Sequence, residues 1–270
     1  MKRNKFKRLF FGLLTLGFAG MLVFSLSVLL PMILEQRESA QANEQLAQHI
    51  NFAPPTQMGT QEGSGPPREP VEGESRNPIY DIPFPTVDFE ALAEINPNVV
   101  GWLFLEGTPI NYPVVHWRDN VRYLHHLFDG RRNAAGTLFV DSHNERGFGN
   151  KHTIIHGHHM RDGSMFAVLE SYRSQEFFEE NPYILLMTPE RNYVIQVFAG
   201  YVASVFDNSW QTEFIGFTAF DEWIRESKER SDFTSNVAVD GRDRVITLST
   251  CSYVFNDARF VLLGKLVPVG

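Results

Sequence analysis

The sequence contains one cysteine, Cys251, which ends an apolar, β-branched run that starts at Val245. A cysteine at a strand end, where the chain leaves its sheet, can present its sulfur to a cleft. An arginine, Arg259, stands at the start of the next apolar run. If the two runs are neighbouring strands, Arg259 lies beside Cys251, where its charge favours the thiolate and stabilises a developing oxyanion. The pattern predicts a thiol nucleophile with a cationic partner, and the alternative is a buried cysteine that acts as a small hydrophobic residue.

A thiol nucleophile also needs an acid that protonates its leaving group. Four of the nine histidines fall within residues 152–160. There an apolar, strand-like run leads into Gly157, and His158 follows it. Because strand ends are where β proteins mount catalytic groups, His158 is the candidate general acid and base.

The same histidines allow a metal-binding interpretation. His152, His156 and His158 share strand parity, so they would face one side of a sheet. However, they lack carboxylate partners at a recognisable spacing, and a single cysteine excludes both a disulfide framework and a cysteine-based zinc cluster. We therefore expect no metal site and no cofactor.

Eight short β-rich runs must position these side chains, and turn residues separate most of them. The runs are 99–105, 110–115, 136–140, 153–156, 183–187, 193–206, 245–249 and 260–267. Helical spacing is found over 87–95, 165–172 and 218–230. This pattern predicts a mainly β protein, a mixed or antiparallel barrel with helices inserted in its loops.

The first 34 residues differ in charge and hydropathy from the rest of the chain. Residues 9–34 carry no charge and include 19 apolar residues, and the run is longer than the ~20 residues that a helix needs to cross a bilayer. Residues 1–8 hold five cations, which should stay in the cytoplasm and leave the rest of the chain outside. A cleaved signal peptide is the alternative, but its apolar core would be only ~7–15 residues long. We expect an uncleaved membrane anchor.

Residues 35–85 change composition again and hold eight of the 15 prolines. The part up to residue 51 is compatible with a continuation of the membrane helix, and residues 52–85 are predicted to be an extended or disordered stalk. The catalytic domain is expected over 86–270. The whole chain has a formal net charge of −8, and with +5 in the first eight residues the remainder carries −13. This balance argues against a protein that binds duplex nucleic acid.

Several motifs together resemble the class B sortases. Residues 247–251 read TLSTC, followed by Arg259 and by GKL at 264–266; residues 156–160 read HGHHM, followed by DGSMF at 162–166. Further matching blocks lie at 96–102, 110–115, 119–120, 123–126 and 135–139. The resemblance covers about residues 86–270 in order. His156 and His159 depart from it, because they replace a usual Tyr and a usual Asn, and Ser252 stands where some members have Glu.

The resemblance implies an eight-stranded sortase barrel with Cys251 as nucleophile, His158 as general acid and base, and Arg259 as the third member. It implies that the sorting signal is bound by residues that match the family's peptide-cradling positions, namely Asn120, Leu124, Ser249 and Thr250. The helix at 218–230 fits the insertion before the catalytic strand that marks class B.

The implied activity is that of a cysteine transpeptidase anchored in the cell membrane with its catalytic domain outside. It would cleave a C-terminal sorting motif, NPxTN-like or [SNP]PxTG-like, of secreted proteins after the threonine. A thioester acyl-enzyme would then pass the protein to an amine of a peptidoglycan precursor. The alternatives are a pilus-assembling sortase, a hydrolytic membrane-anchored cysteine protease, and a non-catalytic extracellular metal-binding module that uses the histidines.

Overall fold

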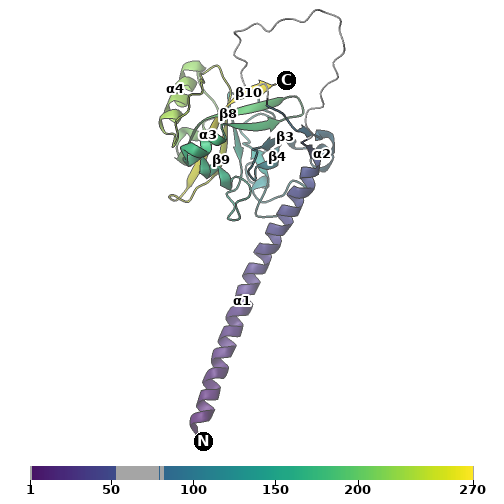
Figure 1. Cartoon of the computed structure of the whole chain (residues 1–270), viewed down its shortest axis with the longest axis vertical. Coiled ribbons are helices and arrows are strands. Elements are labelled where there is room, and N and C mark those ends of the chain that lie inside the picture. Colours follow the sequence, from purple (N-terminus) through teal and green to yellow (C-terminus); the bar gives the residue numbers. More distant parts are fainter. Residues whose placement is uncertain (1, 53–78, 80–81, 270) are drawn as a thin grey trace, which may run out of the picture. The chain divides into compact units, whose positions relative to one another are not determined.

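The computed structural model describes residues 2–52, 79 and 82–269, and the chain divides into two compact units that meet between Ala42 and Asn43. Helix α1 (Lys2–Leu46) forms the first unit and continues into the second (Figure 1). Its most apolar 18-residue window has a mean hydropathy of 2.3, so the helix is long and apolar enough to cross a membrane. The predicted N-terminal helix is confirmed as a candidate span, and it extends past residue 34 as the composition allowed.

The second unit is built on a closed eight-stranded barrel. Its strands follow one another around the barrel in the order β10-β8-β7-β3-β4-β5-β6-β9, and β9 pairs again with β10. Two neighbouring pairs, β4 with β5 and β6 with β9, are parallel, and the others are antiparallel. The strands are β3 (Val99–Phe104), β4 (Asn111–His116), β5 (Leu138–Val140), β6 (His152–His156), β7 (Tyr183–Met187), β8 (Asn192–Ser204), β9 (Val245–Cys251) and β10 (Ala258–Val269).

Alternating side chains divide the barrel wall into an inner and an outer face. In β9, Ile246 and Leu248 belong to the central cluster inside the barrel, with Leu262 of β10 and Ile155 of β6. Val245 belongs instead to a cluster on the outside. Odd-numbered residues of β9, including Cys251, therefore face outward.

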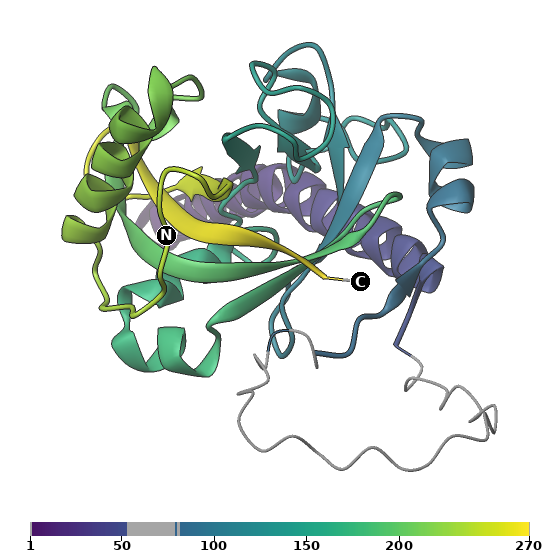
Figure 2. The same ribbon diagram turned by 90° about the horizontal axis from the view of Figure 1, so that it is seen from above.

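The outer cluster covers strands β8 and β10 with helix α4 (Gly216–Glu229). Figure 2 shows α4 against the outer side of these two strands. The buried side chains Phe220, Trp223 and Ile224 lie on one face of the helix and pack on Phe198 of β8. Their 3–4-residue spacing is why this segment could be recognised as an amphipathic helix.

A third cluster lies on the outer side of β3 and β4, around the fully buried Trp102. Helix α2 (Phe89–Ile95) contributes Leu92 to it, and the carboxylate of Asp88 caps this helix by accepting a hydrogen bond from Ala91 N at 3.0 Å. Such caps stabilise a helix by about 1 kcal/mol. The predicted helix over 87–95 thus forms, two residues shorter at its start.

The second unit begins earlier than the predicted domain start at residue 86. Strand β1 (Ile50–Asn51), which follows the short 3-10 helix η1 (Ala47–His49), pairs antiparallel with β2 (Thr86–Val87). Leu46 and Ile50 are buried in the same outer cluster as Trp102. These apolar contacts tie residues 46–51 to the barrel, so the segment that precedes the predicted stalk (52–85) belongs to the second unit. Residues 53–78 and 80–81, which make up most of that stalk, lie outside the described residues.

The segment predicted as a helix over 165–172 is a 3-10 helix rather than an α-helix. The 3-10 helix starts at Ala167, two residues after the predicted start, and the buried residues 166, 169 and 172 are three apart, which is the period of a 3-10 helix. Four elements lie in the loops: η3 (Arg122–Leu124), η4 (Ala167–Arg173), α3 (Gln175–Glu180) and η5 (Asn208–Trp210).

Candidate active site

Cys251 and Arg259 lie directly opposite each other in neighbouring strands. Cys251 is the last residue of β9 and Arg259 is the second residue of β10, and the antiparallel register pairs the two. Directly paired residues of antiparallel strands place their side chains on the same face, with Cβ atoms ~4.5–5.5 Å apart. Both residues are half-buried. The neighbouring-strand arrangement expected from the sequence is therefore present.

The side chain of Arg259 is held by one backbone contact. Its Nη1 donates a hydrogen bond to the carbonyl oxygen of Ala258 at 2.9 Å. Among the described residues this is the hydrogen bond that the side chain makes, so four of the five guanidinium N–H donors have no protein partner there.

His158 reaches the level of Cys251 through the parallel ladder of β6 and β9. His156 pairs with Ser249, and the ladder continues with a hydrogen bond from Gly157 N to Ser249 O at 3.0 Å. Continued two residues past the end of β6, the same register sets His158 level with Cys251. A Cβ on Gly157 would clash with the side chains of Leu138 and Phe166, so only glycine lets the chain pass here.

The imidazole of His158 is half-buried and its orientation is fixed. Its Nε2 lies 2.8 Å from the carbonyl oxygen of Leu124, which can only accept, so Nε2 carries the hydrogen. The neighbouring His159 donates from Nδ1 to the carbonyl oxygen of Cys251 at 3.1 Å. The three predicted catalytic residues therefore come from the ends of three adjacent strands, β6, β9 and β10.

The predicted peptide-binding residues of β9 lie on opposite faces of the strand. Ser249 shares the outer face with Cys251, whereas Thr250 points to the barrel interior, paired with Phe260. Thr250 is 2% exposed, and its hydroxyl has no hydrogen-bond partner among the described residues. Strand alternation thus separates Thr250 from the face that carries the thiol, which argues against the peptide contact expected from the sequence.

Leu124 is the last residue of η3, and Asn120 lies two residues before this helix. Leu124 contributes its backbone carbonyl oxygen to the site, where this oxygen accepts a hydrogen bond from His158. Asn120 is half-buried, and both ends of its amide are bonded: Nδ2 donates to Asp141 Oδ2 at 2.9 Å, and Oδ1 accepts from Ser142 N at 2.7 Å.

Asp141 was not identified from the sequence. It follows directly after β5 and is 8% exposed. Its carboxylate lies 2.8 Å from His156 Nε2 and 2.8 Å from His143 Nδ1. Burial alone would raise the pKa of Asp141, but the hydrogen bonds from His156 and from the backbone N–H of His143 hold it well below its usual range. An acidic residue at the end of an apolar strand, two residues before a histidine, is the signal that the sequence offered.

The three histidines that share strand parity have three different environments. His152 is fully buried, with Nδ1 donating to the Gln211 carbonyl and Nε2 2.7 Å from the hydroxyl of Thr247. His156 is bound to Asp141, and His158 to a backbone carbonyl. Among the described residues, no group of three His, Cys, Asp or Glu side chains is placed to hold a metal ion.

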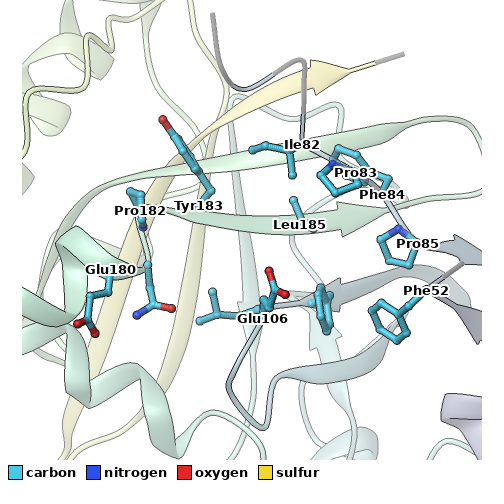
Figure 3. Close-up of a pocket in the computed structure, with 13 residues that line it drawn as sticks. Phe52, Ile82, Pro83, Phe84, Pro85, Glu106, Glu180, Pro182, Tyr183 and Leu185 are labelled. Carbon is cyan, nitrogen blue, oxygen red and sulfur yellow. The ribbon is translucent and has the colours of Figure 1, made fainter. Parts of the chain in front are cut away.

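Both apolar and polar side chains line a pocket of about 530 Å³ elsewhere on the second unit (Figure 3). Its walls include Phe52, Phe84, Phe104 and Leu185. The strands that form it, β3 and β7, lie across the barrel from β9, so this pocket is separate from Cys251.

Comparisons with known proteins agree with this geometry. A family model described as a sortase domain matches residues 103–267. Sortase B of Listeria monocytogenes is 38% identical over 199 residues, which are 73% of this chain and 77% of that protein. The Staphylococcus aureus sortase B–substrate complex is 36% identical with a TM-score of 0.64, over 67% of this chain and 85% of the other. A sortase B complexed with triglycine is 37% identical with a TM-score of 0.64, over 67% and 86%.

The closed mainly β barrel, the strand-end cysteine and the sequence identity point the same way, because the relatives match over two thirds of this chain in both sequence and structure. The chain therefore belongs to the sortase family and is a transpeptidase of class B.

Proposed function

We propose that Cys251, His158 and Arg259 carry out a two-step transfer through a thioester. The thiolate of Cys251 attacks the carbonyl carbon of the threonine in a C-terminal sorting motif. The C–N bond breaks, His158 gives a proton to the departing amine, and the acyl group stays on sulfur. Arg259, with backbone N–H groups near the nucleophile, stabilises the oxyanion of each tetrahedral intermediate.

The second step restores the enzyme. An amine of a peptidoglycan precursor attacks the thioester carbon and loses a proton to His158. The C–S bond then breaks, which releases the amide product and restores the Cys251 thiolate beside a protonated His158. The secreted protein is thereby joined to the cell wall.

The observation that carries this proposal is the alignment of three strand ends. The β6–β9 ladder brings His158 to Cys251, and the β9–β10 ladder pairs Cys251 with Arg259. Structures of relatives in complex with a substrate and with triglycine support a peptide groove and an amine-binding site in this barrel.

The long apolar helix α1 supports membrane anchoring. The five cations of residues 1–8 favour a cytoplasmic N-terminus. This supports a catalytic unit outside the cell, where it would meet secreted proteins and peptidoglycan precursors.

The test uses the full chain in detergent with internally quenched peptides that carry NPxTN-like and [SNP]PxTG-like motifs. We expect Cys251→Ala to abolish acyl-enzyme formation, since the chain holds no other thiol. His158→Ala should reduce turnover at least ~10²-fold and Arg259→Ala on the order of 10²–10³-fold. Double variants should be little worse than the more severe single one. Cleavage by Cys251→Ala near the wild-type rate would overturn the proposal.

Product analysis separates transfer from hydrolysis. With triglycine added, mass spectrometry should detect the peptide joined to triglycine in place of the free acid. A product that stays the free acid at every triglycine concentration, and with every other amine tried, would instead indicate a hydrolytic cysteine protease.

A further inference from the structure

The carboxylate of Asp141 accepts four hydrogen bonds beside the proposed peptide groove. Oδ2 accepts from His156 Nε2 at 2.8 Å and from Asn120 Nδ2 at 2.9 Å. Oδ1 accepts from the backbone N and from Nδ1 of His143, at 2.9 and 2.8 Å. One buried group thus fixes side chains from three segments: the loop before η3, the end of β6 and the turn after β5.

The ionised carboxylate decides which ring nitrogen of His156 carries hydrogen. A carboxylate can only accept, so Nε2 of His156 is the donor. Nδ1 of His156 has no hydrogen-bond partner among the described residues. The two histidines on Asp141 differ in setting, since the side chain of His156 is 22% exposed and that of His143 is 77% exposed.

Asp141 also determines how Asn120 is presented. Because Ser142 N donates to Oδ1 of Asn120 and Nδ2 donates to Asp141, the amide plane cannot flip without losing both bonds. One N–H and one lone pair of the amide then stay available in a fixed direction.

His156 lies on the same outer face of the barrel as Ser249 and Cys251. It pairs with Ser249 in the β6–β9 ladder and lies two residues before His158. Phe139 and Trp210 flank its ring, with centroids 5.2 and 6.4 Å away. Aromatic neighbours at these distances help to hold the imidazole in place.

We propose that Asp141 and His156 are positioning residues for the sorting peptide. Asp141 orients the amide of Asn120 and the ring of His156, and the unpartnered Nδ1 of His156 accepts a hydrogen bond from a polar group of the bound peptide. The pair acts on peptide binding and leaves the chemistry at Cys251 unchanged. This inference rests on the proposed function, because it requires Asn120 to contact the peptide.

The experiment measures kcat and KM of the full chain in detergent with the better of the two quenched peptides. Asp141→Asn keeps the shape but loses two acceptor positions, so we expect KM to rise about tenfold with kcat within about threefold. His156→Phe should raise KM similarly. His156→Gln, which can still donate to Asp141, should recover most of the loss. The matched control is His143→Gln, which changes the exposed partner of the same carboxylate and should leave both constants near wild type.

A double-mutant cycle tests whether Asp141 acts through Asn120. Asn120→Ala should raise KM by itself, and Asn120→Ala combined with Asp141→Asn should be no worse than the more severe single variant. Additive effects, an unchanged KM in Asp141→Asn, or a loss confined to kcat would overturn the inference. If circular dichroism shows that Asp141→Asn does not fold, the KM values of His156→Phe and His156→Gln decide. Equal KM values for these two variants would then overturn the inference. A wild-type chain that cleaves neither peptide would contradict the proposed function instead.

Discussion

His152 is a fully buried imidazole whose two nitrogens both have protein partners. Its Nδ1–H donates to a carbonyl and its Nε2 accepts from the Thr247 hydroxyl, an arrangement that only the neutral ring can make. Burial lowers the pKa of His152 to about 4, against the partly opposing hydrogen bond to the Gln211 carbonyl. His152 therefore takes up a second ring proton less readily in the native state than in the unfolded chain.

Because the pKa of His152 is lower in the folded than in the unfolded chain, acid should destabilise the folded protein. The stability contributed by neutral His152 is complete above pH ~6.5 and is lost as the pH falls towards 4, a change on the order of 3 kcal/mol. Urea unfolding at several pH values should show the free energy of unfolding falling across this window. His152→Gln, which has no proton to gain, should lose less between pH 6.5 and 4. An equal loss of stability in the wild type and in His152→Gln would contradict the assignment.

Arg259 offers a test of shape against charge. A lysine at this position restores a positive charge but not the planar fork that can bond the Ala258 carbonyl and an oxyanion together. We expect Arg259→Lys to recover little of the turnover that Arg259→Ala loses, with the peptide assay as readout. Recovery to within a fewfold of wild type would show that charge alone is sufficient.

At the scale of elements, the packing of residues 46–51 on the barrel is expected to add to its stability. Leu46 and Ile50 together bury apolar surface worth on the order of 3 kcal/mol. A chain of residues 86–270 keeps all eight barrel strands and should fold and cleave peptide. A chain of residues 43–270 should unfold at a temperature roughly 5–10 °C higher. Calorimetry compares the two.

A point variant makes the same comparison without truncation. Ile50→Ala within residues 43–270 should remove part of that difference, since it deletes one of the two buried side chains. Equal unfolding temperatures for all three chains would show that β1 and η1 do not stabilise the barrel.

The barrel strands could be predicted because each carries a run of β-branched or aromatic residues bounded by turn residues. β1 and β2 could not, since two-residue strands show no periodicity. Cys251, His158 and Arg259 were recognisable from strand ends. Asp141 was not, because its role depends on the ladder that brings residue 156 beside it. Thr250 was assigned to the groove although its parity within β9 turns it inward.

At the scale of the whole molecule, the chain joins a segment with five cations and a long apolar helix to an acidic catalytic unit. The excess of cations on one side of the apolar span is the feature that orients a membrane protein. With Cys251 as the chain's only thiol, the position of the catalytic unit can be read directly by chemical labelling.

We expect a membrane-impermeant maleimide to label Cys251 on intact bacterial cells that express the full chain. Cys251 is half-buried at a strand end, and we expect its sulfur to react with a small reagent. Cys251→Ala should abolish labelling and sets the background. Adding Lys5→Cys to Cys251→Ala moves the thiol to the opposite side of the apolar helix, and labelling should then require permeabilised cells. The opposite result would show the reverse orientation: the Lys5→Cys chain is labelled on intact cells, and Cys251 of the wild-type chain is labelled only after permeabilisation. A chain that leaves the membrane fraction in alkaline carbonate would show that α1 is not a stable anchor, because a spanning helix resists that extraction.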